Sequence, residues 1–220
     1  MLCVMADDAH VLVLPRGRHR LTRAQVAASQ RGRMLDAMAQ VVAEQGYAHT
    51  TVAAVVARSG VSSKAFYEQF SDKEDCFLAA YDTGTDVLLH AMRAAFESAP
   101  ADPLIRFDRA LGAYLHLLAT ETAFARTFLI EVYAAGPQAL ERRFAVQRLF
   151  VDFVVESLPD RVERFACEAL VGAVSSLVTR PVASHRYEDL AALRVPITEL
   201  VRQCLSAAQP VTGSARQLGA

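Results

Sequence analysis

The chain of 220 residues is 53% hydrophobic and 21% charged, a composition that excludes an intrinsically disordered protein and allows one large domain or two small ones with buried cores. No apolar run approaches the length of a membrane span and the N-terminus lacks the basic start of a secretory signal, so the sequence favours a soluble cytoplasmic protein with no membrane partner. The net charge of −1 conceals a basic first third, because residues 15–73 carry nine Lys or Arg against four Asp or Glu, which favours a polyanion as the partner of that segment.

The same charge count also fits an ordinary charged surface. Helical periodicity appears along almost the whole chain and no stretch shows the alternation of a strand, so we expect an all-α fold. Residues 1–23 are predicted to form a flexible basic arm. Its arginine-rich cluster at 16–20 is either a solvated tail or an arm for the minor groove of DNA.

Two helices are expected after the arm. The first covers about 24–45 and should end at Gly46 in a left-handed C-cap. The second is short and amphipathic, with Thr50 or Thr51 as its N-cap, and it should end just before Gly60.

A third short helix, over about 63–70, completes a helix-turn-helix, whose general signature is two short amphipathic helices joined by a glycine-containing turn. Gly60 permits the tight turn, Val61 can fill the gap between the helices, and Ser62 can cap the third helix. The side chains expected to face the base edges of DNA are Ser63, Lys64 and the exposed edge of Ala65.

A capping box of Ser71 and Glu74 is predicted to start a long helix that runs through Phe96. The break at 99–103 separates it from further helices, which end at turns containing proline or glycine. Pro196 lies within the last of these, which either kinks there or starts just before it. The predicted ranges are 104–120, 122–135, 137–157, 159–179 and 189–208, followed by a disordered tail at 209–220.

Several separate blocks in the first third agree in order and spacing with one known family. They are Gln30-Arg31-Gly32-Arg33, Gly46-Tyr47, Thr50 to Val56, Gly60-Val61-Ser62, Ala65 to Phe70 and Ser71-Asp72-Lys73-Glu74. Over about residues 24–81 the chain therefore resembles the tetracycline-repressor (TetR/AcrR) family of transcriptional regulators. The resemblance implies an all-helical homodimer with a DNA-binding domain at 24–72 and a domain for effector binding and dimerisation at 73–208.

The resemblance also implies which residues meet DNA. Ser63 and Lys64 occupy base-reading positions, and Lys64 suits the O6/N7 edge of guanine. Phosphate contacts are implied for two side chains and for two residues at helix N-termini: Tyr67, Lys73, Thr51 and Ser62. The full set of implied DNA-binding residues is Arg31, Thr51, Ser62, Ser63, Lys64, Ala65, Tyr67, Gln69 and Lys73.

Two of these positions depart from the common pattern of the family, and two have other interpretations. Ala65 stands where threonine is frequent, so it can offer only a methyl contact, and Gln69 stands where histidine is frequent. Tyr67 is alternatively a packed core aromatic. Lys73 is alternatively a solvated lysine, although the helix dipole disfavours a cation in the first turn.

The second domain is rich in aromatic residues, any one of which is most simply part of the core. Together with the resemblance, they predict a cavity between helices for a small hydrophobic effector. The predicted ligand-binding set is Met92, Phe96, Tyr114, Phe124, Phe128, Tyr133, Phe150 and Phe153. The polar candidates to orient a ligand are His90, His116, Arg126 and Glu131, each of which fits a surface or paired residue better.

The last two long helices are predicted to form a dimer seam, with a plain intramolecular core as the alternative. The first contributes small residues and three larger apolar ones, and the second contributes an apolar stripe. These residues are Ala166, Ala169, Ala173, Ser176, Leu170, Val174, Leu177, Leu193, Ile197, Leu200, Val201 and Cys204.

The sequence thus predicts a repressor that binds a palindromic operator on double-stranded DNA as a dimer in the nucleoid and is released by a small apolar effector. An activator or ligand-independent regulator of the same fold is the alternative, and a helical adaptor or an enzyme is less favoured. The sequence contains no motif for catalysis, a cofactor or a metal. The cysteines Cys3, Cys76, Cys167 and Cys204 stand at no metal or redox spacing, and we expect reduced thiols with three of them partly buried.

Overall fold

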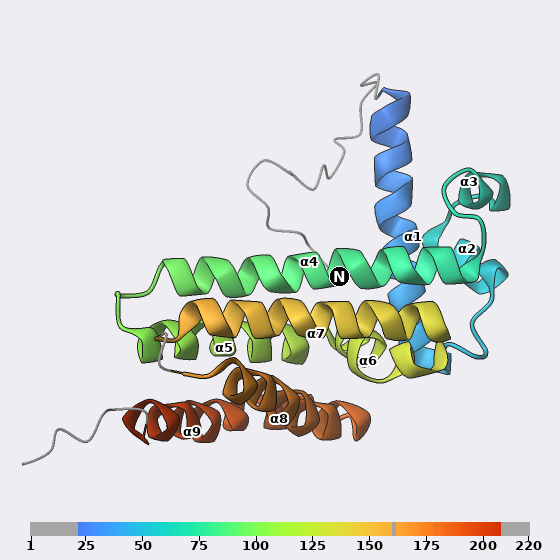
Figure 1. The fold of residues 1–220 in the computed structure, drawn as a ribbon. Coiled ribbons are helices and arrows are strands. Elements are labelled where there is room, and N and C mark those ends of the chain that lie inside the picture. Colours follow the sequence, from blue (N-terminus) through green and yellow to red (C-terminus); the bar gives the residue numbers. More distant parts are fainter. Residues whose placement is uncertain (1–21, 160–161, 208–220) are drawn as a thin grey trace, which may run out of the picture.

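The computed structural model describes residues 22–159 and 162–207, and within these ranges every regular element is helical, which confirms the predicted all-α fold (Figure 1). The predicted arm and tail lie almost wholly outside the described residues. The elements are α1 (Arg23–Gln45), α2 (Val52–Ser59), α3 (Ser63–Tyr67), α4 (Lys73–Glu97), α5 (Pro103–Thr120), α6 (Thr122–Leu129), η1 (Glu131–Ala134), α7 (Pro137–Ser157), α8 (Arg164–Ala183), η2 (Tyr187–Leu193) and α9 (Arg194–Ala207).

The long helices form a layered bundle with the helix-turn-helix at one end. In Figure 1, α4, α5 and α7 run lengthwise beside one another, and α8 and α9 cover the side away from α4. Helix α1 crosses this direction and contacts α4 and α6 with its C-terminal part, while its N-terminal turns project beyond the bundle. Helices α2 and α3 lie next to α1, so the projecting end of α1 and helix α3 are on the same side of the molecule.

Local capping explains where the first helices begin and end. Thr22 and Gln25 form a capping box at the start of α1, and the Thr51 hydroxyl accepts a hydrogen bond from the N–H of the third residue of α2. Gly60 ends α2 with φ 65° and ψ 29°, the left-handed conformation that favours glycine. Gly46 also has a positive φ of 79°, but its ψ of 155° is extended, so the predicted left-handed C-cap of α1 is wrong.

The N-terminus of α4 is capped one residue later than predicted. Asp72, rather than Ser71, is the N-cap, and its carboxylate accepts the N–H of Asp75 at 2.9 Å. The backbone N–H of Ser71 donates in turn to the Asp75 carboxylate at 2.9 Å. A carboxylate accepts these N–H groups better than a hydroxyl does, so Asp72 and Asp75 displace the predicted Ser71–Glu74 pair.

Three of the later predicted helices have different limits. The helix predicted at 122–135 is interrupted at Ile130, after which η1 forms a tighter turn. Helix α8 runs through Pro181, which was expected to end it, and it closes when the backbone N–H of Ser184 donates to the carbonyls of Arg180 and Pro181. Helix α9 begins two residues before Pro196, as one of the two alternatives predicted.

One continuous hydrophobic core runs through both predicted domains. Its largest fully buried side chains come from α1, α3, α4 and α6 and include Met38, Phe66, Tyr81 and Phe128. Among the described cysteines, Cys76 and Cys167 are buried and Cys204 is exposed, while Cys3 lies outside the described residues.

Helix α8 corrects the expectation that no segment could span a membrane. By length and composition alone it is apolar enough to do so, because its apolar stretch has a mean hydropathy of 1.3. Only 22% of that stretch is buried in the structure. Small residues and valines between its terminal arginines give it this composition. One side of the helix lines a pocket described below, so the apolar residues on that side have partners within the bundle.

Candidate DNA interface and ligand pocket

Helix α3 presents an uncovered face to solvent. Ser63 and Lys64 are exposed, and Tyr67 is 60% exposed, so the interpretation of Tyr67 as a core aromatic is wrong. The Ser62 hydroxyl accepts the N–H of Ala65 at 3.1 Å, as predicted for the cap. Lys64 makes only a loose contact of 3.8 Å with Glu68, which leaves it available to another partner.

The opposite face of α3 and the turn that follows it anchor the helix-turn-helix to α1. Phe66 and Phe70 are buried, and the guanidinium of Arg31 lies 4.5 Å from the centre of the Phe70 ring. The side-chain amide of Gln69 donates to the Ala27 carbonyl at 3.3 Å. Arg31 and Gln69 therefore position the helix-turn-helix from within the chain, in addition to the DNA contacts implied for them.

Two arginines hold the turn between α2 and α3, and sequence reasoning missed both roles. Arg33 of α1 donates to the Ser59 carbonyl at 3.1 Å, at the C-terminus of α2. Arg58 pairs with Glu44 of α1 at 2.5 Å. Their spacing from these partners, 26 and 14 residues, left no local signal in the sequence.

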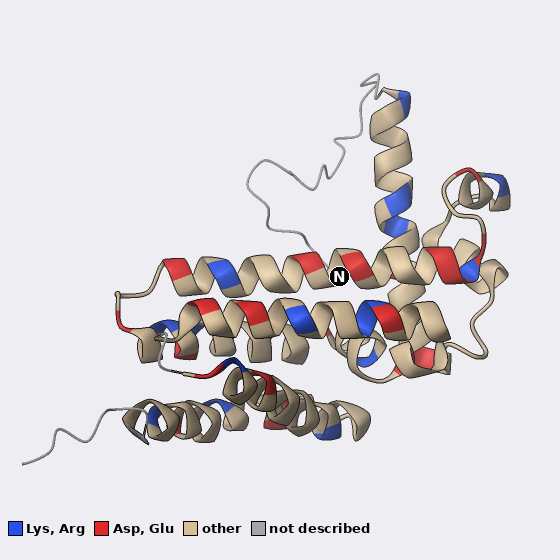
Figure 2. Cartoon of the chain, viewed as in Figure 1, with Lys and Arg blue, Asp and Glu red and all other residues tan. Residues whose placement is uncertain are grey.

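Lys73 lies in the first turn of α4 against the end of α1. Its ammonium donates to the Tyr47 carbonyl at 3.0 Å and lies 4.1 Å from the centre of the Tyr47 ring. The interpretation as a merely solvated lysine is therefore wrong, although an ammonium has three donors and two remain for a phosphate. Figure 2 shows the charges on this side of the molecule, where the projecting turns of α1 carry basic residues.

Tyr47 also joins the helix-turn-helix to the bundle. Its backbone N–H donates to the carboxylate of Glu131 at 3.0 Å, and its ring packs edge-on against Phe77 at 4.9 Å. Glu131 is 7% exposed and pairs with Arg126 at 3.1 Å. Arg126 and Glu131 are thus a structural pair at this joint, which supports the paired interpretation given above.

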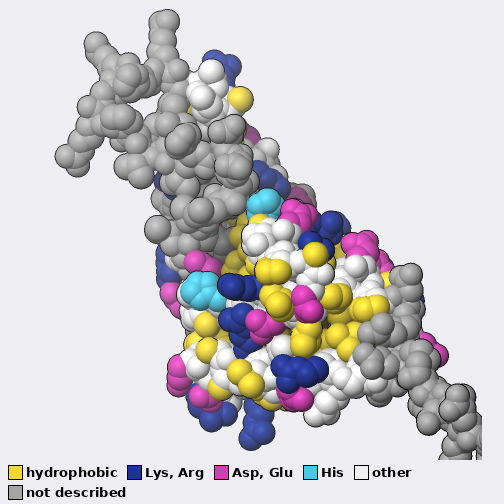
Figure 3. Space-filling model, turned by 90° about the vertical axis from the view of Figure 1, so that its left-hand side faces the viewer, with side chains coloured by type: hydrophobic (Ala, Val, Ile, Leu, Met, Phe, Trp, Pro, Cys, Tyr) yellow, Lys and Arg dark blue, Asp and Glu magenta, His cyan; other side chains and the backbone are white. Residues whose placement is uncertain are grey.

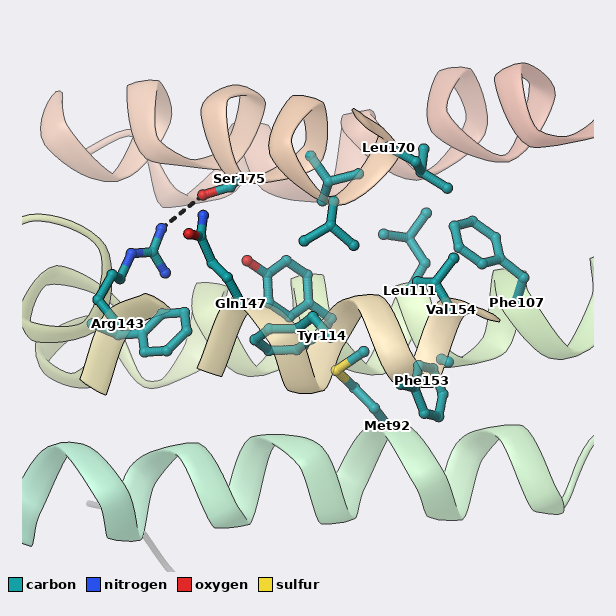
Figure 4. Close-up of a pocket in the computed structure, with 15 residues that line it drawn as sticks. Met92, Phe107, Leu111, Tyr114, Arg143, Gln147, Phe153, Val154, Leu170 and Ser175 are labelled. Atoms are coloured by element: carbon teal, nitrogen blue, oxygen red, sulfur yellow. Dashed lines mark hydrogen bonds between the residues drawn. The ribbon is translucent and has the colours of Figure 1, made fainter. Parts of the chain in front are cut away.

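The bundle encloses an apolar pocket between α4, α5, α6, α7 and α8 (Figure 4). Its free volume is about 60 Å³, which holds only a few water molecules. The lining is aromatic and aliphatic apart from a few polar groups on α5, α7 and α8. Such an apolar cavity with few polar groups is typical of a small-molecule site.

The family model of bacterial regulatory proteins, tetR family, matches residues 34–80, which span the helix-turn-helix and the start of α4. Over these residues the chain matches the DNA-binding domain of the TetR family.

Similar proteins match this chain over much of its length. The HTH-type transcriptional activator FasR of Mycolicibacterium smegmatis is 26% identical over 158 residues, which are 72% of this chain and 71% of FasR. The fold is shared with the fatty acid degradation regulator FadR from Bacillus halodurans, with a TM-score of 0.70, 20% identity and coverage of 78% of this chain and 94% of FadR. FadR from Bacillus subtilis, solved in complex with stearoyl-CoA, has a TM-score of 0.70, 18% identity and coverage of 77% and 96%.

Five of the eight predicted ligand-binding residues line the pocket, and three do not. Phe96 packs edge-on against Phe153 one layer farther out. Phe124 packs against the backbone of α4 at Gly84, where it leaves no space for a Cβ. Tyr133 is 56% exposed. Those in the lining are Met92, Tyr114, Phe128, Phe150 and Phe153.

The predicted set missed the polar groups of the pocket. His90 and His116 are exposed and lie outside the lining, whereas Arg143, Gln147 and Ser175 are part of it. A signal was present in the sequence, because Arg143 interrupts an apolar stripe of α7 at helical spacing. The buried members of that stripe are Ala139, Val146, Phe150 and Phe153.

The residues of the predicted dimer seam lie in three environments: the core, the pocket lining and the surface. Ile197 and Val201 are buried within the chain, as in the alternative interpretation, and Leu170 and Val174 line the pocket. The small residues of α8 at 166, 169, 173 and 176 are exposed, and large apolar side chains are exposed beside them on α8 and α9. These are Phe165, Leu177, Val195 and Leu200. Figure 3 shows hydrophobic side chains also reaching the surface among charged ones at the end of the bundle.

Proposed function

We propose that this regulator binds a palindromic operator as a dimer and that a small apolar effector with an acyl chain releases it. The observation that carries the proposal is the exposed face of α3, where Ser63 and Lys64 face solvent at the capped N-terminus of the helix and Tyr67 is exposed at its C-terminal end. A helix of this kind enters the major groove with its first residues against the base edges.

A dimer is supported by the exposed apolar face of α8 and α9. Leu177 and Leu200 are 46% and 45% exposed, and Phe165 is 76% exposed. Apolar side chains gathered in this way mark an association surface. Two copies joined there would present two α3 helices, and such pairs read half-sites about 34–36 Å apart.

The pocket provides a route for the effector to act on DNA binding. Its free volume of about 60 Å³ is far below the roughly 300–1,000 Å³ of ligand sites, so an acyl chain has to move the surrounding helices apart. Helix α4 contributes Met92 to the pocket and carries Lys73 at its other end. A ligand that binds the widened conformer better shifts the population towards it and changes the spacing of the two α3 helices.

Acyl ligands are favoured by the comparisons. One structural neighbour was solved in complex with stearoyl-CoA, and another is a regulator of fatty acid degradation. The similarity to FasR, a transcriptional activator, also favours a second candidate, in which the bound dimer activates transcription. A promoter reporter measured with and without the gene distinguishes a repressor, whose loss raises expression, from an activator, whose loss lowers it.

The test of the proposed function is selection of genomic DNA fragments by the purified full-length protein, followed by gel shifts over a range of salt. We expect palindromic fragments whose affinity falls steeply with salt and is reduced by acyl compounds. An absence of salt-sensitive binding to every fragment would contradict operator binding. Binding that no acyl compound weakens would contradict release by an acyl effector.

A further inference from the structure

Among the described residues that line the pocket, only Arg143 is charged. It lies in the middle of α7 and is 2% exposed. Its Nη2 donates to the Ser175 hydroxyl at 2.7 Å, while its buried Nε has no hydrogen-bond partner. No carboxylate pairs with this guanidinium in the part of the chain that the structure describes, so the pocket contains a buried cation without a counter-ion.

The groups around Arg143 are neutral. The guanidinium lies 5.1 Å from the centre of the Phe128 ring. Burial opposes its charge, but the hydroxyls of Tyr133, Tyr81 and Tyr114 together hold the pKa of Arg143 above its ordinary value. Burial also raises the pKa of Tyr81 to about 12, so this hydroxyl is a neutral dipole at physiological pH. Dipoles compensate a buried charge only partly, and an anion bound beside Arg143 would complete the compensation.

The polar and apolar parts of the pocket are separated along its length (Figure 4). Gln147 and Ser175 lie near Arg143 at one end, with the hydroxyl of Tyr114 directed towards them, and Phe107 and Leu170 lie at the other end. Along α7 the lining extends from Arg143 to Val154, which at 1.5 Å per residue is about 16 Å. This arrangement fits an elongated amphiphile with one polar end.

We propose that the effector is an acyl compound with a free carboxylate, whose head pairs with Arg143 and whose chain lies along α7 towards Phe107. The inference rests on the proposed function and specifies the ligand of that same pocket. A guanidinium offers two parallel donors that match a carboxylate, and Gln147 and Tyr114 can donate to it as well. The thioester of an acyl-CoA is neutral where it meets the acyl chain, so it would leave Arg143 unpaired.

The test compares three ligands with the same chain, namely decanoate, decanol and decanoyl-CoA, on the full-length wild-type protein. Affinity is measured by calorimetry and DNA release by gel shift. We expect decanoate to bind at least about tenfold more tightly than decanol and to release DNA at lower concentration, as a hydrogen-bonded charge pair requires. Equal affinity for decanoate and decanol, or tighter binding of decanoyl-CoA than of decanoate, overturns the proposal.

Substitutions of two neighbouring arginines on α7 show whether the preference for decanoate depends on Arg143. In Arg143→Gln the preference for decanoate over decanol should disappear while the affinity for decanol is kept. Arg142→Gln is the matched control, because Arg142 is exposed and pairs with Asp82 at 3.5 Å, so it should behave as wild type. A preference that survives in Arg143→Gln overturns the proposal, and if that variant does not fold, the wild-type comparison still decides.

The same measurements separate this inference from the function on which it rests. If decanol and decanoyl-CoA bind and release DNA but the carboxylate has no advantage, the effector remains an acyl compound and the role of Arg143 is refuted. If none of the three binds, both the acyl effector and the carboxylate proposal are refuted.

Discussion

At the scale of single residues, the two lysines of the DNA-facing side differ in their surroundings. Lys64 is exposed and has only a 3.8 Å contact with Glu68. Lys73 is half-buried, with its ammonium on the carbonyl and ring of Tyr47. Lys64 is free to reach a base of the operator, whereas Lys73 is held against Tyr47. The two lysines should therefore contribute to DNA binding in different ways.

We predict that Lys64→Ala relaxes specificity at one base pair of the operator and leaves the stability unchanged. Lys73→Ala should weaken binding to all operators, flatten the dependence of log K on log salt by about one unit, and lower the free energy of unfolding by about 1 kcal/mol because Tyr47 loses its cation. Gel shifts on operator variants at several salt concentrations, together with denaturant unfolding, check both variants. Equal effects of the two variants on every sequence would contradict these roles.

At the scale of elements, the contact between α4 and α6 depends on a glycine. A Cβ at Gly84 would overlap the ring of Phe124, which is 2% exposed and has little room to move. Gly84→Ala should therefore lower the free energy of unfolding by about 1–3 kcal/mol through overpacking. The matched control is Gly32→Ala in α1, where a Cβ meets nothing within 4 Å and should instead stabilise the helix by about 0.5–1 kcal/mol. Urea unfolding of both variants measures the difference. A Gly84→Ala variant as stable as wild type would contradict the close packing of Phe124 on Gly84.

The contact between α5 and α9 depends on an ion pair that should respond to pH. The guanidinium of Arg194, at 2.6 Å, and the hydroxyl of Thr198, at 3.0 Å, hold the pKa of Asp108 below its ordinary value. Because the folded pKa is the lower one, this stabilisation is complete above the unfolded pKa of about 3.9 and is lost as the pH falls through the folded pKa.

We therefore predict that Asp108→Asn is less stable than wild type near neutral pH and that the difference shrinks below about pH 4. Arg194→Met should show the same convergence, since it removes the other partner. Urea midpoints measured at a series of pH values check this. A constant difference between wild type and Asp108→Asn at all pH values would show that Asp108 contributes through packing alone.

At the scale of the whole molecule, the exposed apolar residues of α8 and α9 predict the assembly. Leu177→Glu and Leu200→Glu should convert a dimer of the 24.0 kDa chain into monomers and weaken operator binding by about tenfold or more, because one α3 helix then reads one half-site. Sedimentation equilibrium gives the mass. Val26→Glu, a substitution at a residue 39% exposed on α1, is the control for oligomeric state. Variants that sediment as wild type would place the interface elsewhere.

Sequence reasoning succeeded where the determinants are local. The caps at Thr51 and Ser62 and the turn at Gly60 depend on residues within one turn of each other, so α2 and α3 were placed to within a few residues. The pocket depends on which helices meet, and that is not a local property. Arg143 interrupts an apolar stripe of α7, but only the packing of α8 against α7 brings Ser175 to its guanidinium.

The contacts of Tyr47 have a consequence for how the protein unfolds. Its carbonyl, ring and N–H are engaged by Lys73, Phe77 and Glu131, and the Thr127 hydroxyl of α6 donates to the Ala39 carbonyl of α1 beside them. Because the helix-turn-helix and the bundle also share one hydrophobic core, we expect that neither unfolds while the other keeps its packing. Spectroscopic probes placed in α3 and in α8 should lose signal at the same denaturant concentration, and an effector bound in the bundle should delay both together.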